Sequence, residues 1–288
     1  MEHIVSTMME KYGPKTGEQT ISAFKEVVQE IALSAFGRTD FFEKAAFYGG
    51  TALRIFYGLN RFSEDLDFSL EKPEGSFDIS RYFSTLETTF SSFGLSFQAT
   101  LKKKNVESPI QSAFLKGNTA EHVFLIQPQP ELAKHIQKNE VIKIKIEIDI
   151  NPPAFASYEY KFGLLPQPYR VRLYDKGSLF AGKIHALLCR EWKNRVKGRD
   201  LYDFVFFLSD GSGFNLKHLE SRLRQSGRWN GDREMTTDDV KKMLKEKFLS
   251  LDYSSARADV TNFISDLRVL DLWGADFFLS LADRLRSI

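Results

Sequence analysis

The sequence predicts an α/β (α+β) protein, with a mixed sheet and its helices in the N-terminal part and a helical C-terminal part. Two observations support this fold class. Isoleucine fills every second position over residues 142–150, which is typical of a β-strand, whereas apolar residues recur at helical spacing from residue 176 onward. A stretch with four prolines, residues 152–170, separates the two patterns and is predicted to be an irregular linker. We therefore predict two domains, an α/β domain over residues 1–170 and a helical domain over residues 171–288.

The elements of the N-terminal part follow from apolar patterns and turn residues. Helical spacing of apolar side chains predicts an amphipathic helix over residues 18–37, and the apolar run 45–48 predicts a buried strand ending in a Gly-Gly turn. Asn151-Pro152-Pro153 ends the last strand, because proline cannot donate to a β-ladder. The other predicted elements are helices at 51–57 and 78–93 and strands at 65–70, 95–101, 109–115, 122–127 and 142–150.

The C-terminal part shows only helical patterns. The predicted helices cover residues 176–193, 199–209, 215–225, 237–249, 255–267 and 273–286. Hydrophobic residues make up 42% of the 288-residue chain and charged residues 27%, which is ordinary for a globular protein. The core is therefore expected to be of normal size.

Charge, cysteine content and apolar runs indicate a cytoplasmic protein. The net charge of +2 does not by itself indicate a nucleic-acid-binding protein. The N-terminus lacks the basic and apolar regions of a secretory signal, and no apolar run reaches the ~18 residues needed to cross a membrane. The single cysteine, Cys189, cannot form an internal disulfide and lies in an apolar helical stretch, so we expect a buried thiol in a reducing compartment.

Four carboxylates alternate with apolar residues on two predicted strands. Asp65 and Asp67 lie on one strand, and Glu147 and Asp149 repeat the arrangement on the strand 142–150. Mg²⁺ prefers oxygen ligands, and two such ions held on one rigid face lower the barrier to in-line displacement at phosphorus. If the two strands are neighbours, all four carboxylates converge. The alternative is a solvated face, since Lys143 and Lys145 share it with Glu147 and Asp149 and could pair with them.

A candidate phosphate-binding turn precedes the first acidic strand. Gly49 and Gly50 permit close backbone approach, and Thr51 places a hydroxyl at a predicted helix N-terminus, where amides point outward. Arg61 and Ser63 lie just ahead of the aspartates, in positions suited to phosphate contact. The alternative for the glycines is a plain turn.

These motifs resemble those of a known superfamily. Gly-Gly-Thr followed after residues 52–64 by Asp-x-Asp is similar to the signature of DNA polymerase β-like nucleotidyltransferases. The runs Gly49-Gly50-Thr51-Ala52-Leu53-Arg54 and Arg61-Phe62-Ser63-Glu64-Asp65-Leu66-Asp67-Phe68 resemble the AbiEii/AbiGii toxin family, which is related to the mycobacterial MenT toxins. Lys183, Arg195 and Arg199-Asp200-Leu201-Tyr202-Asp203 resemble that family's lysine and Arg-Asp-x-x-Asp motif. The resemblance spans residues 48–208.

The resemblance implies the mixed sheet of a polymerase β-like nucleotidyltransferase and the transfer of NMP from an NTP, with Mg²⁺ as cofactor. Asp65 and Asp67 would bind the metal, with Glu147 or Asp149 as the third carboxylate; Asp149 is the further metal ligand we predict. Lys183 would neutralise triphosphate charge. The remaining implied roles are phosphate binding by Gly50, Thr51 and Ser63, and completion of the site by Asp200 or Asp203.

The downstream motif also has purely structural alternatives. The alternative for Lys183 is a solvated helix position, and the alternative for Asp200 is the start of a helix. Arg199 is spaced to pair with Asp203 along one helix face. Five basic residues form either a polar helix end or a track for an RNA phosphate backbone; they are Arg190, Lys193, Arg195, Lys197 and Arg199.

The function implied by the resemblance is that of a toxin of a toxin–antitoxin or phage-abortive system. Its acceptor would be the 3′ end of tRNA, its effect blocked translation, and its partner a separately encoded antitoxin. Two alternatives remain at this stage. One is protein nucleotidylation on a Tyr or Ser hydroxyl. The other is an inactive module that binds RNA or a protein partner, against which the intact Gly-Gly-Thr and Asp-x-Asp motifs argue.

Overall fold

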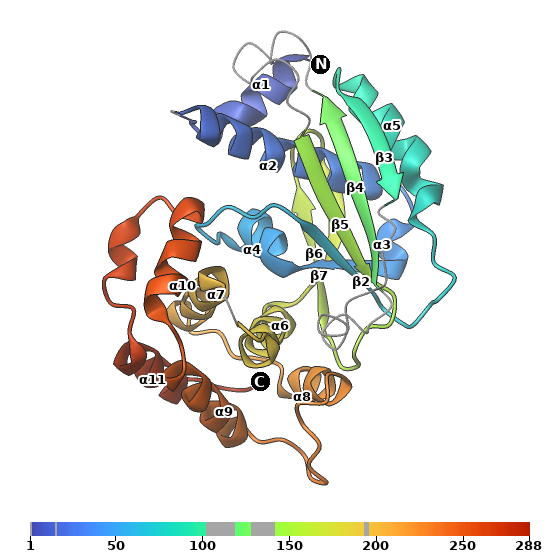
Figure 1. Cartoon of the computed structure of the whole chain (residues 1–288). Helices are drawn as coiled ribbons and strands as arrows, with labels where there is room; N and C mark the ends of the chain where they lie inside the picture. The colour runs from blue at the N-terminus through green and yellow to red at the C-terminus, as the bar shows by residue number, and fades with distance from the viewer. Residues whose placement is uncertain (1, 15, 102–118, 128–141, 193–195) are drawn as a thin grey trace.

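The computed structural model describes residues 2–14, 16–101, 119–127, 142–192 and 196–288 (Figure 1). In these ranges the strands form one mixed seven-stranded sheet with the order β3-β4-β5-β2-β1-β7-β6. The strands are β1 (Ala45–Tyr48), β2 (Leu66–Leu70), β3 (Ser96–Leu101), β4 (Thr119–Gln127), β5 (Ile142–Asp149), β6 (Tyr158–Gly163) and β7 (Tyr169–Tyr174). The predicted strand at 109–115 lies outside the described residues.

An aromatic core fills the N-terminal part of the molecule. Phe36, Phe41 and Phe68 are fully buried, with ring centroids 4.2 Å apart for Phe36 and Phe41 and 4.9 Å apart for Phe41 and Phe68. Aromatic pairs at such spacings add to the stabilisation from burial alone. The helices of this part are α1 (Glu2–Glu10), α2 (Gly17–Phe36), α3 (Phe41–Lys44), α4 (Gly49–Tyr57) and α5 (Phe83–Ser92), which follows the short 3₁₀ helix η1 (Ile79–Tyr82).

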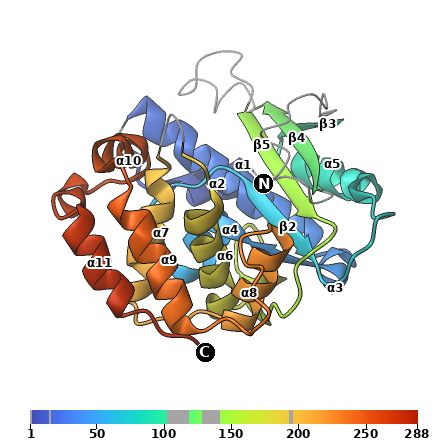
Figure 2. The ribbon, with the colours of Figure 1, turned by 60° about the horizontal axis from the view of Figure 1, so that its bottom comes forward.

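A second core lies among the C-terminal helices. Phe180 and Phe207 stack at its centre with centroids 4.4 Å apart, and Leu53 of α4 and Tyr174 of β7 join the same cluster. Figures 1 and 2 show these helices gathered on one side of the sheet. They are α6 (Lys176–Cys189), α7 (Gly198–Ser209), α8 (Leu216–Gln225), α9 (Thr237–Leu249), α10 (Tyr253–Val260) and α11 (Ala275–Asp283), with 3₁₀ turns η3 (Thr261–Phe263) and η4 (Leu267–Leu270).

The predicted linker at 152–170 is wrong in part, because residues 158–163 and 169–170 belong to strands of the sheet. β6 and β7 pair antiparallel, and β7 also pairs in parallel with β1. The prolines mark the ends of these strands: Pro152 and Pro153 precede β6, and Pro166 and Pro168 lie in the connection to β7. The predicted boundary between residues 170 and 171 falls inside β7. The division into two domains stays a prediction.

Most other predicted elements are confirmed within one to four residues, and the helix predicted at 255–267 is shorter than expected. It ends as α10 at Val260 and continues only as the 3₁₀ turn η3. Cys189 is buried, as expected, and burial raises the pKa of its thiol. Among the described helices, none is both long and apolar enough to cross a membrane.

Candidate active site

The two acidic strands are neighbours, as the convergence of their carboxylates requires. β2 and β5 run parallel, and their register aligns Asp67 with Glu147 and Ser69 with Asp149. Residues aligned in register project to the same face of a sheet. Leu66 and Phe68 are fully buried on the opposite face and fix the strand in place. Asp67 and Glu147 therefore lie side by side.

Burial and neighbouring charges together raise the pKa values of Asp65 and Asp67. Burial, followed by the charges of Glu147 and Asp65, raises the pKa of Asp67 from its usual 3.8 to about 7. Burial also raises the pKa of Asp65, where the charge of Lys145 opposes the shift and that of Glu147 adds to it. Lys145 Nζ forms an ion pair with Glu147 Oε1. This group of Asp65, Asp67 and Glu147 is called the acidic cluster below.

Asp149 lies one register step beyond the acidic cluster. Its Oδ1 accepts a hydrogen bond of 3.0 Å from the backbone N–H of Asn151. Burial raises the pKa of its carboxyl, whereas the charge of Arg222 lowers it. The charges that raise the pKa of Asp67 come from Glu147 and Asp65. The strand register therefore places Glu147, and not Asp149, next to Asp67.

The chemistry of the acidic cluster suits a hard divalent cation. All its donors are carboxylate oxygens, the ligands that Mg²⁺ prefers. The ionised form of Asp67 is destabilised by its neighbours, and a bound cation would reverse that destabilisation. In the part of the chain that the structure describes, no three His, Cys, Asp or Glu side chains are already arranged around a common point for a metal. The donor types fit a metal, and the side chains would have to close around it.

Both glycines of the turn are required by close packing. Gly49 has φ +86°, and a Cβ atom there would lie 2.2 Å from Oδ2 of Asp67. A Cβ atom on Gly50 would lie 2.8 Å from Ser63 Oγ and from Arg61 Nη2. Instead of a separate turn, Gly49 and Gly50 form the start of α4 directly after β1, and a side chain at either position would displace an aspartate of the acidic cluster or the loop before it.

The loop leading to β2 is held through its backbone. Thr51 is fully buried, and its hydroxyl donates a hydrogen bond to the carbonyl of Asp65. Gln29 Nε2 on α2 donates to the carbonyls of Ser63 and Glu64 at 3.0 and 2.9 Å. These bonds fix the position at which Asp65 enters the site. Ser63 is nearly buried, and phosphate binding by Thr51 and Ser63 stays a prediction.

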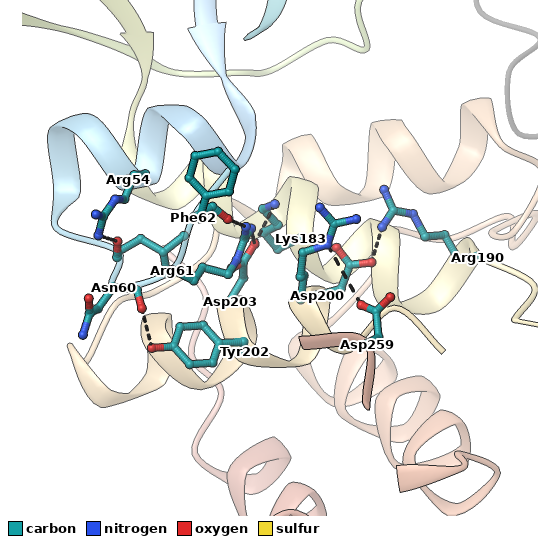
Figure 3. Close-up of polar contacts among 12 residues, drawn as sticks. Arg54, Asn60, Arg61, Phe62, Lys183, Arg190, Asp200, Tyr202, Asp203 and Asp259 are labelled. Carbon is teal, nitrogen blue, oxygen red and sulfur yellow. Dashed lines mark hydrogen bonds and ion pairs between the residues drawn. The ribbon is translucent and has the colours of Figure 1, made fainter. Parts of the chain in front are cut away.

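A buried carboxylate links the N-terminal loop to the C-terminal helices (Figure 3). Asp203 accepts hydrogen bonds from Nε and Nη2 of Arg61 at 2.6 and 2.7 Å, and Lys183 Nζ lies 2.7 Å from its Oδ2. Burial alone would raise the pKa of Asp203, but the charges and hydrogen bonds of Arg61 and Lys183 lower it below the usual value. The charge of Lys183 also lowers the pKa of Asp67. Lys183 is thus placed by Asp203 and acts on the acidic cluster.

Asp200 is also held by a cation. Arg190 Nη1 donates to its Oδ2 (Figure 3). Arg199 does not form the predicted pair with Asp203, whose oxygens are taken by Arg61 and Lys183; instead its Nε lies 4.0 Å from Asp259 and its guanidinium 4.1 Å from the Phe263 ring centroid. Lys193 and Arg195 of the predicted basic track lie outside the described residues.

Sequence reasoning missed two residues that shape the site. Gln29 is fully buried on α2 next to the buried Glu26 and Glu30, and this group of polar residues in a largely apolar helix was the available signal. Lys145 was given no role in the active site, but the structural alternative for this face, in which Lys143 and Lys145 pair with the carboxylates, anticipated its ion pair with Glu147. Its spacing of two residues from Glu147 on a strand was the signal for that pair.

Comparison with known proteins relates this geometry to one family and to solved structures. Residues 31–280 match the family model described as nucleotidyl transferase AbiEii toxin, type IV TA system. MenT4, a nucleotidyltransferase toxin of Mycobacterium tuberculosis H37Rv, is similar at 16% identity and a TM-score of 0.58, covering 99% of this chain and 88% of its own. JHP933 from Helicobacter pylori is similar at 19% identity and a TM-score of 0.52, covering 91% and 90%. No curated protein matches the sequence. The structural likenesses confirm the predicted fold class.

Proposed function

Because the chain belongs to the AbiEii family of nucleotidyltransferase toxins of type IV toxin–antitoxin systems, we propose that it uses Mg²⁺ to transfer NMP from an NTP to the 3′ end of tRNA. Family membership itself makes the protein a nucleotidyltransferase with an NTP substrate and an antitoxin partner. The metal, the acceptor, the residue roles and the resulting block of translation are our proposal. The observation that carries it is the alignment of Asp67 with Glu147 next to Lys183.

In this proposal Asp65, Asp67 and Glu147 hold the metal. Glu147 is preferred over Asp149 as the third carboxylate because it is aligned with Asp67, whereas Asp149 is aligned with Ser69. When bound, Mg²⁺ neutralises the triphosphate and lowers the pKa of the acceptor hydroxyl. Gly49, which has no side chain, keeps the space beside Asp67 open.

Lys183 neutralises the charge that develops on the leaving pyrophosphate. Asp203 supports this role, because its Oδ2 lies 2.7 Å from Lys183 Nζ and fixes the ammonium group. Asp203 is itself held by Arg61. A lysine with a fixed position contributes more than a mobile one, since its ordering cost is met before the reaction. Asp203, Asp200 and Arg61 are then positioning residues, not ligands of the metal.

The charge at the start of α7 supports an RNA acceptor. The pKa of Lys197 is lowered, first by the charge of Arg190 and then by burial, with a further contribution from Arg199. Cations that repel one another in this way are stabilised by a phosphate backbone. Arg199 also lowers the pKa of Asp65, so this basic surface adjoins the acidic cluster.

The proposal is tested by incubating the full-length protein with each α-labelled NTP, total tRNA and Mg²⁺. We expect label in the tRNA fraction, lost in the Asp65→Ala/Asp67→Ala double variant. Lys25→Met is the matched control, because Lys25 pairs with Glu64 beside the cluster and has no proposed role in the reaction. Label in a protein fraction instead would favour protein nucleotidylation. A folded protein that labels neither fraction would contradict the proposed acceptor.

A further inference from the structure

Lys145 occupies the same sheet face as the acidic cluster. It lies two residues before Glu147 on β5, so the two side chains project to the same side. The register aligns Leu66 with Ile146, which brings Lys145 level with Asp65, the residue before Leu66. Lys145 Nζ is ion-paired with Oε1 of Glu147. One ammonium group therefore stands among three carboxylates.

Lys145 acts on every member of the cluster. Its charge is the first to oppose the effect of burial on the pKa of Asp65, and it also lowers the pKa of Asp67. Lys183 also lowers the pKa of Asp67, but its ammonium is fixed 2.7 Å from Asp203 Oδ2, whereas that of Lys145 is ion-paired with Glu147 inside the cluster. The Lys145 side chain is 35% exposed, so it can leave the cluster without disrupting a packed core.

We propose that Lys145 is a positioning residue, a built-in counter-ion that competes with the divalent metal for Glu147. A carboxylate oxygen that accepts from an ammonium group is not available to a metal ion until that contact breaks. The ion pair keeps the carboxylates assembled before the metal arrives and weakens metal binding by its own free energy. Once displaced, the ammonium remains on the face that receives the triphosphate. The inference rests on the proposed function, since it takes the acidic cluster as the metal site.

The test is calorimetric titration of the full-length protein with Mn²⁺ in the absence of nucleotide. Lys145→Met keeps the aliphatic stem and removes the charge, so we expect Mn²⁺ to bind about fivefold tighter than to the native protein, the equivalent of the ~1 kcal/mol of a partly exposed ion pair. Lys145→Arg keeps the charge and is expected to bind Mn²⁺ like the native protein. Lys25→Met, which removes a lysine paired with Glu64, is expected to leave Mn²⁺ binding unchanged.

A thermal readout provides the second measurement. Without its counter-ion the cluster repels itself, so Mn²⁺ is expected to raise the Tm of Lys145→Met by more than it raises that of the native protein. Lys145→Gln serves as a second variant if Lys145→Met does not fold. Equal or weaker Mn²⁺ binding in the charge-removing variants would overturn the competition while leaving the metal site intact. Absence of Mn²⁺ binding in all variants would overturn the metal site of the proposed function as well.

Discussion

The carboxylates on β2 and β5 and those on α7 lie in one site but in opposite electrostatic settings. Asp67 has a raised pKa, because burial and two other carboxylates act on it together. Asp203 is fully buried, whereas Asp67 is half-buried, yet the pKa of Asp203 is lowered, since a guanidinium and an ammonium group hold both of its oxygens. Both carboxylates come from Asp-containing motifs of the sequence.

This difference distinguishes a binding carboxylate from a supporting one. A buried acid surrounded by other acids gains when a cation binds, whereas an acid already held by two cations would lose those contacts. This difference supports our proposal that the acidic cluster binds the metal and that Asp203 positions Lys183.

The largest expected effect is on catalysis at the acidic cluster. Asp67→Asn keeps the shape of the side chain and removes the charge needed to hold a metal. We expect NMP transfer to fall on the order of 10⁴-fold, about 5 kcal/mol of transition-state stabilisation. The free energy of unfolding should stay equal or rise by ~1 kcal/mol, because repulsion from Glu147 and Asp65 is relieved.

The rate of label incorporation measures NMP transfer, and urea unfolding of the same preparation measures the free energy of unfolding. A clear loss of stability in Asp67→Asn would contradict the assignment of Asp67 to a repulsive, ligand-binding group.

The second effect is on stability, at α7. Asp203→Asn leaves Arg61 and Lys183 without their shared anion in a buried setting, and we expect the free energy of unfolding to fall by ~3 kcal/mol. Asp200→Asn is the matched control on the same helix. Its partner Arg190 is 32% exposed, so the expected loss is only ~1 kcal/mol or less.

Chemical denaturation of both variants decides the point. If Asp203→Asn is as stable as the native protein, Asp203 is not the supporting carboxylate described above.

The third effect concerns Gly49, which packs closely against Asp67 of the acidic cluster. Gly49→Ala combines a positive φ with a Cβ atom 2.2 Å from Asp67 Oδ2, whereas Gly58→Ala has a φ of +78° and no atom within 4 Å. We expect ~1 kcal/mol of strain in Gly58→Ala and ~2 kcal/mol in Gly49→Ala. Only Gly49→Ala should also lose NMP transfer, by about 100-fold, since it displaces a proposed metal ligand. Equal transfer rates in the two variants would show that Asp67 tolerates the displacement.

The two acidic strands could be predicted from the sequence, but the partners of the carboxylates could not. The alternation of Asp65, Asp67, Glu147 and Asp149 with apolar residues predicted both strands, because one face of each is buried. Which carboxylate faces Asp67 depends on the register between strands distant in the chain, and no local pattern encodes that register. The partner of Asp203 could not be predicted either, because Arg61 lies 142 positions away in the chain and no local pattern connects the two residues.

The strands β6 and β7 were missed because prolines are evidence of strand ends as much as of linkers. Val171 and Leu173 alternate with exposed or half-buried residues in β7, but the run is six residues long and starts next to Pro168. The short helix α3 covers only four residues, too few for a helical period to show. Long periodic elements such as α2 and α9 could be predicted closely, since several turns repeat the same pattern.

The smallest expected effect is the pH dependence of stability in metal-free buffer, and its sign separates the two groups of carboxylates. The pKa of Asp67 is raised from 3.8 to about 7, so folding favours its protonated form. Its contribution is fully present below the unfolded pKa and is lost as the pH rises from about 4 to 7. Asp203 has a lowered pKa, so its contribution is present above the unfolded pKa and is lost as the pH falls. Urea unfolding of the native protein and of Asp67→Asn at pH 4.5 and pH 7.5 isolates the contribution of Asp67 and of the carboxylates coupled to it, because the titrations of uncoupled groups cancel in the difference. We expect the native protein to lose ~1–2 kcal/mol of unfolding free energy relative to Asp67→Asn over this interval, a value reduced for partial solvent screening.

Parallel stability curves for the two proteins would mean that Asp67 already has a cation partner in the metal-free state. The same measurement on Lys145→Met would identify whether Lys145 is that partner.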